Sequence, residues 1–225
     1  MAAKFDILFE DTHLIVLDKP AGLLSQGEHT GDENLVDLLR AHFGRNYVGL
    51  VHRLDRNTSG VMVVAKRSKS AERLTRALQE GTLVRSYLAW LEGSLSTADA
   101  PARWEDWLVR DEKTNTTRVA RPGSPGAKKA SLEIRPKRQA LLGGGPVTLC
   151  EFELDTGRAH QIRAQAAARG HPLLGDRKYG AKLEFSRPAL HSHQIAFPHP
   201  MSRELLRFEC PLPADLELPA LTTRR

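Results

Sequence analysis

The sequence predicts an α+β fold in which a mainly antiparallel or mixed central β-sheet is flanked by helices and loops. Runs rich in Val, Ile and aromatic residues, which are typical of strands, outnumber the segments with helical spacing. Gly and Pro separate many of these runs at hairpin-like intervals. Strands and helices do not alternate regularly, which argues against a parallel sheet built from βαβ units.

The predicted strands begin at the N-terminus with residues 5–9 and 13–18, and the second of them ends at Pro20, shortly before Gly22. Further strand-like runs lie at 61–65, 84–92, 104–109, 117–121, 128–135, 147–154, 193–197 and 204–209. The segment "LLGGGP" at 141–146 predicts a turn or an exposed loop.

Three segments have the apolar spacing of amphipathic helices. Residues 34–43 predict the first, with Gly44 as its stop signal. We expect Ser68 to cap the second helix and Gly81 to end it. Residues 159–169, which are rich in Ala, predict the third.

The composition is that of a globular protein with a basic surface. The chain has 225 residues, a formal net charge of +6 and a pI of about 9.5, which favours polyanionic partners such as RNA or DNA. Its two cysteines, Cys150 and Cys210, cannot form a disulfide scaffold or a C-x-x-C metal motif. Without a signal peptide, an apolar span, a repeat or a low-complexity linker, residues 1–225 predict a single soluble, cytoplasmic domain.

The most polar segment of the chain is "VHRLDRNTSGVMVVAK" at 51–66. Asp55 lies there between two apolar runs, and Arg53 and Arg56 lie within two residues of it. A rigid scaffold can present such a loop carboxylate to a substrate. An isolated Arg-x-Asp is more typical of a solvated turn with a local ion pair, so this segment alone does not establish a site.

A second polar cluster lies at 154–176, "LDTGRAHQIRAQAAARGHPLLGD". Arg158, His160, Gln161 and Arg163 gather at a predicted strand-to-helix junction, where free backbone N–H groups can bind anions. Arg163 lies on an otherwise Ala-rich helix, so it can point inward to a carboxylate. Read alone, the segment is more typical of an exposed helix face.

Together these motifs resemble those of the RluA-type RNA pseudouridine synthases. "HRLDRNTSG" at 52–60 resembles the catalytic signature of that family. The other matching segments, in chain order, are "LIVLDKPAGLL" at 14–24, "VRSYLAWLEG" at 84–93, "LDTGRAHQIRAQAAARGHPLLGDRKYG" at 154–180 and "LHSHQIAFPHP" at 190–200. They cover most of the chain from about residue 6 to 210, so the resemblance implies the catalytic fold of the family.

The resemblance also implies roles for five residues. Asp55 corresponds to the catalytic carboxylate, Tyr87 to the aromatic residue that stacks on the target base, and Arg163 to the arginine that pairs with the aspartate. Arg53 corresponds to the side chain that enters the base stack when the target uridine leaves it. Ile162 corresponds to a wall of the uracil pocket. Whether the carboxylate attacks C1′ or acts by deprotonating C2′ stays open.

Several other polar residues are expected to be structural. We interpret Lys19 and Pro20 as shaping one side of the cleft. His52 and His160 are expected to make structural hydrogen bonds, because the family pattern asks neither to be a general base. Asp176 is interpreted as a loop-stabilising carboxylate.

The chain begins almost directly at the first matching motif, which predicts a short form without the N-terminal S4 domain that many relatives carry. Loops near 94–103, 110–127 and 141–146 are then the expected places for substrate selection. The basic residues of 110–129 form either an RNA-facing rim or a solvated charged hairpin, and are Arg110, Lys113, Arg118, Arg121, Lys128 and Lys129.

The sequence leaves three functions possible. The first is a synthase that isomerises uridines in structured RNA, such as a tRNA or rRNA stem-loop, and works as a monomer with no metal, redox cofactor or nucleotide. The second is an RNA-binding or RNA-folding protein without turnover. The third is an N-glycosidase that releases free base. The presence of Asp55, Tyr87 and Arg163 favours the synthase.

Overall fold

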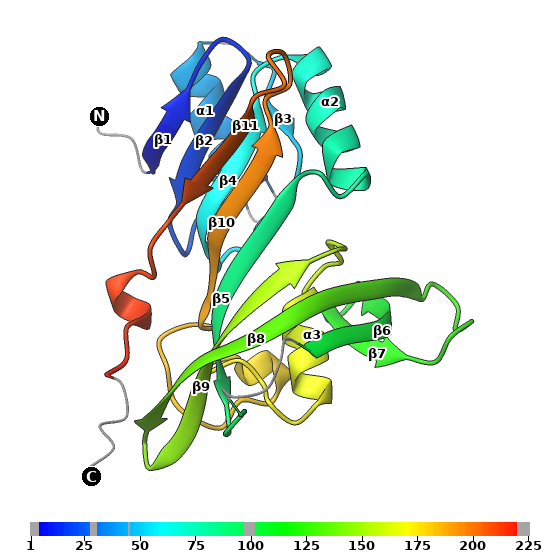
Figure 1. Ribbon diagram of the computed structural model, residues 1–225, viewed down its shortest axis with the longest axis vertical. Helices are drawn as coiled ribbons and strands as arrows, with labels where there is room; N and C mark the ends of the chain where they lie inside the picture. The colour runs from blue at the N-terminus through cyan, green and yellow to red at the C-terminus, as the bar shows by residue number, and fades with distance from the viewer. Residues whose placement is uncertain (1–4, 28–30, 45, 97–101, 220–225) are drawn as a thin grey trace. The chain divides into compact units, whose positions relative to one another are not determined.

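The computed structural model describes residues 5–27, 31–44, 46–96 and 102–219 (Figure 1). These residues form two compact units. The first unit contains the described residues up to Arg85 together with His191–Pro211, and the second contains Ser86–Leu190 with the described residues from Leu212 onward. The prediction of a single domain over 1–225 stays a prediction.

The first unit is built on a mixed sheet with the strand order β1-β2-β4-β10. The pairs β1/β2 and β2/β4 are antiparallel, whereas β10 runs parallel to β4. Two more strands join this sheet, since β3 pairs with β4 and β11 pairs with β10. The strands are β1 (Asp6–Glu10), β2 (Leu14–Lys19), β3 (Gly49–Leu50), β4 (Ser59–Ala65), β10 (Leu190–Pro198) and β11 (Leu205–Glu209).

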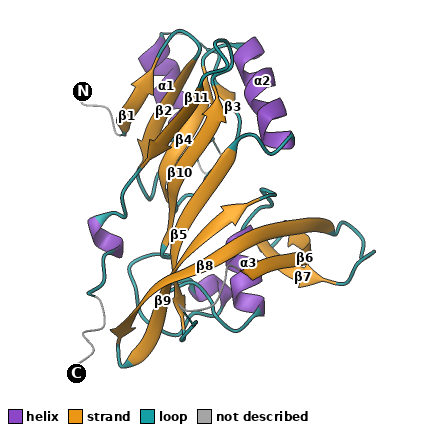
Figure 2. Ribbon diagram, viewed as in Figure 1, coloured by secondary structure: helices purple, strands orange, loops and turns teal. Residues whose placement is uncertain are grey.

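Two helices complete the first unit (Figure 2). Helix α1 (Leu35–Phe43) is capped at its N-terminus by Asn34, whose side chain accepts the N–H of Asp37 at 3.1 Å, and at its C-terminus by Gly44 in the left-handed conformation. Helix α2 (Ser68–Gln79) has Arg67 at its N-cap position and no side-chain cap. The prediction that Ser68 caps this helix is therefore wrong, because Ser68 is already its first residue.

The core of the first unit comes from the β-branched and leucine runs of the sequence. Leu14, Val16, Val61 and Val63 pack with Phe197 of β10 in one apolar cluster. Four consecutive residues of β2 and all of β4 are buried. Strands buried in this way require continuous apolar runs, which is what the sequence shows at 14–17 and 61–65.

The second unit is an antiparallel sheet with the strand order β5-β9-β8-β6-β7. Its strands are β5 (Val84–Glu92), β6 (Ala102–Asp111), β7 (Thr116–Ala120), β8 (Lys128–Leu142) and β9 (Gly145–Leu154). Helix α3 (Gln161–Ala168) and two short 3-10 helices, η1 (Arg177–Tyr179) and η2 (Ala214–Leu216), complete it. The α+β class with a mixed sheet and few helices is confirmed.

The segment 141–146, for which the sequence predicts a turn or an exposed loop, forms a tight turn. Strand β8 continues to Leu142 and β9 starts at Gly145, so only Gly143 and Gly144 form the turn. Both have positive φ, 56° and 79°, as a two-residue hairpin turn requires. The three glycines therefore indicated a tight turn between long strands and not a wide loop. Among the described residues, no helix is long and apolar enough to cross a bilayer.

Gly60 permits the close approach of β4 and β10 at the start of β4. It has φ +112° and is paired in register with Ser192. A Cβ atom at this position would lie 2.1 Å from the Ser192 carbonyl oxygen, which is backbone and cannot rotate away. Only glycine fits here, because both the backbone angle and the available space exclude a side chain.

We predict that Gly60→Ala destabilises the protein by about 3 kcal/mol or more, since backbone strain and overpacking add. Urea unfolding monitored by circular dichroism measures this loss. Gly123→Ala is the matched control, because Gly123 also has positive φ, +80°, but has open space around it. The control should lose only about 1–2 kcal/mol. Equal losses in the two variants would contradict a steric role for Gly60.

Candidate active site

Asp55 occupies a short turn that directly precedes β4. The N–H of Thr58 donates to the Asp55 carbonyl at 3.0 Å and closes the turn. Asp55 is half-buried, while Arg53 and Arg56 on either side are exposed. The backbone therefore holds the carboxylate at the surface of a packed sheet, which is the loop-on-scaffold arrangement expected from the sequence.

The turn is anchored by the ammonium group of Lys19, which is fully buried at the end of β2. Its Nζ donates to the carbonyl oxygens of Pro20 at 2.8 Å, Leu23 at 2.8 Å and Arg56 at 3.2 Å. A buried ammonium is costly unless its donors are hydrogen-bonded, so these oxygens must stay in place around it. Lys19 thereby joins the segment after β2 to the residue that follows Asp55.

Ser25 anchors the residue on the other side of Asp55. Its hydroxyl donates to the Leu54 carbonyl at 2.7 Å and accepts the Leu54 N–H at 3.1 Å. The Gly22 N–H donates to the Arg56 carbonyl at 2.8 Å, and the Arg56 Nε donates to the Gly22 carbonyl at 3.1 Å. The two neighbours of Asp55 are thus both held by the segment that follows β2.

His52 is buried in the same motif and has a structural contact. Its Nε2 accepts the N–H of Val63 in β4 at 3.3 Å, so the ring proton is on Nδ1. Burial, together with the charge of Arg85, lowers the pKa of His52 to about 3. The ring is therefore neutral near pH 7 and is a poor general base, in agreement with the structural role expected for it.

The second unit carries the other predicted site residues. Tyr87 lies in β5, paired in register with Phe152 of β9, and its side chain is only 5% exposed. Ile162 and Arg163 lie in the first turn of α3, and both are buried. Arg163 therefore points inward from its Ala-rich helix, as the sequence suggested.

The Arg163 guanidinium forms a two-point ion pair with Asp176. Nε donates to Oδ2 at 2.6 Å and Nη2 donates to Oδ1 at 2.8 Å, and Asp176 is 1% exposed. The guanidinium carbon lies 4.8 Å from the centroid of the Tyr179 ring. The Tyr179 hydroxyl accepts the Thr117 N–H at 2.8 Å and lies 2.9 Å from His160 Nδ1. Burial raises the pKa of Tyr179, so the hydroxyl keeps its proton near neutral pH.

The five predicted site residues thus divide between the units. Asp55 and Arg53 belong to the first unit, and Tyr87, Ile162 and Arg163 belong to the second. The predicted ion pair between Asp55 and Arg163 stays a prediction. Sequence reasoning missed the contributions of Ser25 and Tyr179 and the ion pair of Asp176. Tyr179 and Asp176 both lie inside the matched segment 154–180, which was the available signal.

Comparison with known proteins identifies the family. Residues 13–168, more than half of the chain, match the sequence model of the family described as RNA pseudouridylate synthase. This chain belongs to that family. Its members are isomerases that act on RNA, so the predicted enzyme class is confirmed and the chain is an RNA pseudouridine synthase by family.

Curated relatives support the same assignment. The chain is 37% identical over 220 residues to the uncharacterized RNA pseudouridine synthase YhcT of Bacillus subtilis, covering 95% of this chain and 70% of the relative. It is 36% identical over 236 residues to the ribosomal large subunit pseudouridine synthase D of Nitrosomonas europaea, covering 96% of this chain and 64% of the relative. The chain thus spans roughly two thirds of the length of these relatives.

Solved structures agree on the fold. The structure titled "Human RNA Pseudouridylate Synthase Domain Containing 1" superposes with a TM-score of 0.76 at 24% identity, covering 93% of this chain and 84% of the human one. The structure titled "Human RNA Pseudouridylate Synthase Domain Containing 4" gives a TM-score of 0.73 at 23% identity, covering 94% of this chain and 90% of that one. At this identity the likeness shows the pseudouridine synthase fold.

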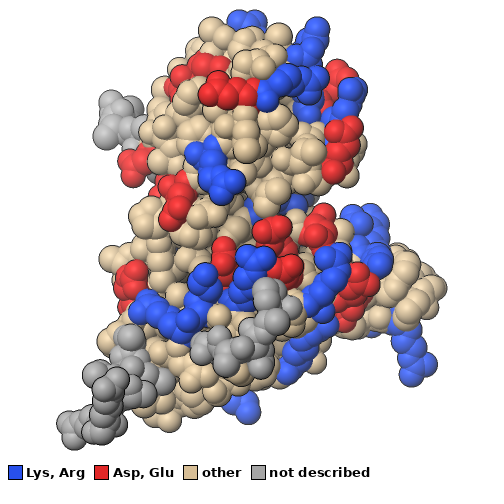
Figure 3. All heavy atoms as spheres, viewed as in Figure 1, with Lys and Arg blue, Asp and Glu red and all other residues tan. Residues whose placement is uncertain are grey.

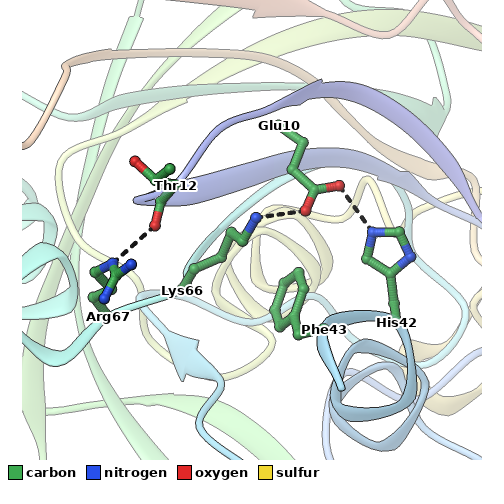
Figure 4. Close-up of a pocket in the computed structure, with 6 residues that line it drawn as sticks. All are labelled: Glu10, Thr12, His42, Phe43, Lys66 and Arg67. Carbon is green, nitrogen blue, oxygen red and sulfur yellow. Dashed lines mark hydrogen bonds and ion pairs between the residues drawn. The ribbon is translucent and has the colours of Figure 1, made fainter. Parts of the chain in front are cut away.

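A polar pocket of about 300 Å³ lies in the first unit and is separate from the turn of Asp55 (Figure 4). Lys66 donates to Glu10 at 2.6 Å and to the Asp11 carbonyl at 2.6 Å, and its ammonium lies 5.2 Å from the centre of the Phe43 ring. Arg67 donates to the Thr12 carbonyl at 3.1 Å. Both cations are hydrogen-bonded to acceptors of the protein itself. In this synthase the side chains that line the pocket therefore connect neighbouring secondary-structure elements.

The expected basic rim lies on β6, β7 and β8 and in the turns that join them, and Figure 3 shows Lys and Arg side chains over this part of the second unit. All six predicted cations are exposed, namely Arg110, Lys113, Arg118, Arg121, Lys128 and Lys129. Lys129 forms an ion pair with Glu105 at 3.2 Å, and Arg110 donates to Asn115 at 2.8 Å. Of the expected selection loop at 94–103, residues 97–101 lie outside the described part of the chain.

We predict that Lys19→Met destabilises the protein by about 3 kcal/mol, because it leaves buried carbonyl oxygens without a donor. Urea unfolding measures the loss. Hydrogen exchange of the Gly22 amide, which bonds to Arg56, should also become faster as the two segments separate. Lys69→Met on the exposed face of α2 is the control and should change neither quantity. Unchanged Gly22 protection in Lys19→Met would exclude Lys19 as the anchor.

Proposed function

We propose that this synthase converts a specific uridine of structured tRNA or rRNA into pseudouridine, with Asp55 acting at the ribose after the base has flipped out of its stack. The observation that carries the proposal is the anchored turn of Asp55. Its two neighbours, Leu54 and Arg56, are each held by hydrogen bonds, while the carboxylate itself stays half-buried. Catalysis requires a reacting group that is fixed before the substrate arrives.

The reaction is an isomerisation in which no atom is gained or lost overall. The bond between uracil N1 and ribose C1′ breaks, the base turns, and a bond forms between C5 and C1′. The proton of C5 leaves and N1 gains one. A carboxylate can stabilise the positive charge that develops on the sugar, or trap it covalently. Attack at C1′ and proton removal at C2′ both use the ionised form of Asp55.

The remaining site residues serve the base and the carboxylate in this proposal. Tyr87 stacks on the flipped uracil, Ile162 walls the pocket, and Arg163 pairs with Asp55. Arg53 enters the gap that the base leaves, for which its exposure is suited. Flipping costs a few kcal/mol, and stacking in the pocket offsets that cost.

The substrate is proposed to be a folded stem-loop bound partly through the cations of β6, β7 and β8. The relative in Nitrosomonas europaea is named for the ribosomal large subunit, which makes that RNA the first substrate to test. Phosphate contacts from Lys and Arg supply affinity that depends on salt and not on sequence. We further propose that the enzyme acts as a monomer in the cytoplasm and needs no cofactor.

We predict that Asp55→Asn lowers turnover by roughly three orders of magnitude or more, because the neutral amide cannot stabilise or trap the sugar cation. The assay measures tritium released to water from large-subunit rRNA and tRNA transcripts labelled at uracil C5. RNA affinity, measured by filter binding, should stay within about twofold, since Asp55 contributes no phosphate contact.

Glu72→Gln is the charge-matched control, because Glu72 is exposed on α2 and pairs only with Arg76 among the described contacts. The same assay separates the three functions that the sequence left open. Tritium release without free uracil supports the synthase, free uracil supports an N-glycosidase, and binding with neither product supports an RNA-folding protein. Near-normal tritium release by Asp55→Asn would contradict the catalytic role of Asp55.

We predict that replacing Lys113, Arg118 and Arg121 by Gln weakens RNA binding and reduces the slope of log affinity against log salt by about one for each phosphate that is no longer neutralised. The measurement is a filter-binding titration at several salt concentrations. The turnover of bound RNA in a single-turnover assay should change little, since these residues lie outside the proposed catalytic group.

The control carries the same three-charge change in the first unit, with Lys69, Arg76 and Arg207 replaced by Gln. All three side chains are exposed. A salt slope that falls equally in both triple variants would show a general charge effect and would contradict a specific role for the β6–β8 surface.

A further inference from the structure

Arg163 is held more rigidly than a surface arginine. Its pair with Asp176 uses Nε and Nη2 of one guanidinium edge, at 2.6 and 2.8 Å. Two parallel hydrogen bonds to one carboxylate fix both the position and the plane of a guanidinium. Burial of both partners excludes the water that would otherwise compete for these bonds.

The face of the Tyr179 ring packs against the Arg163 guanidinium. The guanidinium carbon lies over the ring, 4.8 Å from its centroid, so the ring limits movement of the group toward that side. The hydroxyl accepts the Thr117 N–H from β7 and is hydrogen-bonded to His160 Nδ1 at the start of α3. The ring is thus fixed at its far end by two other elements of the second unit.

The segment that supplies Asp176 and Tyr179 is itself closely constrained. The Asp176 N–H donates to the Leu173 carbonyl at 2.9 Å, and the Asp176 carbonyl accepts the N–H groups of Tyr179 at 2.9 Å and Ala181 at 3.2 Å. Gly175 has φ +76°, and a Cβ atom there would lie 2.5 Å from the Arg187 carbonyl oxygen. The loop therefore has one conformation that directs the Asp176 carboxylate inward.

A purely stabilising role is a poor explanation for this ion pair. Removing a guanidinium and a carboxylate from water costs about as much as their attraction returns, and apolar replacements of buried pairs are often neutral or more stable. What a buried two-point pair supplies better than any apolar contact is orientation. Orientation matters here because Arg163 is the residue proposed to pair with Asp55.

We propose that Asp176 and Tyr179 are positioning residues for the isomerisation, which hold the Arg163 guanidinium in the one orientation that serves Asp55. This rests on the proposed function, since the role of Arg163 belongs to it. Neither residue needs to touch the RNA. Asp176 fixes the guanidinium edge through Nε and Nη2, and Tyr179 fixes its plane and joins it to β7.

The test compares single-turnover tritium release and RNA affinity in Asp176→Asn and Tyr179→Phe. Misplacing a reacting group by about 1 Å can lower a rate by about a hundredfold, so Asp176→Asn should lose about ten- to a hundredfold in rate. Tyr179→Phe keeps the ring and loses only the hydroxyl bonds, so its loss should be smaller. RNA affinity should be unchanged in both, which a misfolded second unit would not allow.

Arg177→Gln is the matched control. Arg177 follows Asp176 directly and pairs with Glu184 at 2.7 Å, but both members of that pair are exposed. The control removes an ion pair from the same segment without touching Arg163, and its rate should equal that of the wild type. Circular dichroism and melting temperature confirm that each variant is folded.

A double-mutant cycle separates positioning from stability. In an Arg163→Lys background, which lacks the two-point fork, Asp176→Asn should cause little further loss of rate if Asp176 acts only through Arg163. Additive losses would overturn the proposal, and so would wild-type rates in both Asp176→Asn and Tyr179→Phe. If Asp176→Asn does not fold, the same cycle with Tyr179→Phe decides the question.

Failure of this proposal can be told apart from failure of the proposed function. A wild-type protein that releases tritium, with variants at Asp176 and Tyr179 that release it equally fast, overturns the positioning role alone. A wild-type protein that releases no tritium from either class of transcript overturns the synthase assignment and the positioning role with it.

Discussion

The fully buried ammonium group of Lys19 is the constraint on which the turn of Asp55 depends. An ammonium with three donors requires three acceptors when water is excluded, and the carbonyls of Pro20, Leu23 and Arg56 provide them. These oxygens belong to segments far apart in sequence. Satisfying one buried charge therefore fixes the path of both segments, and the carboxylate between Leu54 and Arg56 takes its place from that path.

The second unit uses a buried charge in a similar way. Arg163 is held by Asp176 and by the face of Tyr179, as Lys19 is held by carbonyl oxygens in the first unit. In both cases the charged group and its partners together add little net stability, because desolvation offsets most of their attraction, whereas loss of the charge alone is costly because it leaves buried partners unsatisfied. In both cases the charged group makes a strong contribution to geometry, because hydrogen bonds to a charge are short and directional. In each unit, therefore, a buried and hydrogen-bonded charge holds a group in one orientation.

Much of the fold can be predicted from local sequence patterns. Most of what cannot be predicted depends on contacts between residues far apart in the sequence. The strand 84–92 was predicted with the bounds of β5, and the apolar spacing over 34–43 predicted α1, which begins at Leu35 with Asn34 as its cap. The turn predicted within 141–146 is present, but the sequence did not show how short it is, because glycine indicates a turn and not its length. Ser68 was misassigned as a cap because helix ends are set by hydrogen bonds as well as by residue type.

The site shows the same limit. Its motifs located Asp55, Tyr87 and Arg163 along the chain, because the spacing within each motif is local. The bond between Ser25 and Leu54 joins residues 29 apart, and the pair of Arg163 with Asp176 joins residues 13 apart across an irregular loop. No periodicity relates such residues. Their meeting depends on the path of the loop, which only the folded chain determines.

The path of this loop explains why glycine directly precedes aspartate in the segment "LLGD" at 173–176. Gly175 can adopt φ +76° and can lie against the backbone of Arg187, where any side chain would collide. This places Asp176 with its carboxylate inward, and inward it meets a guanidinium that its own helix has already buried. The glycine thus acts through backbone freedom, the aspartate through charge, and the arginine through the orientation that results. A substitution at Gly175 would therefore disturb the orientation of Arg163 without replacing any residue that contacts Arg163.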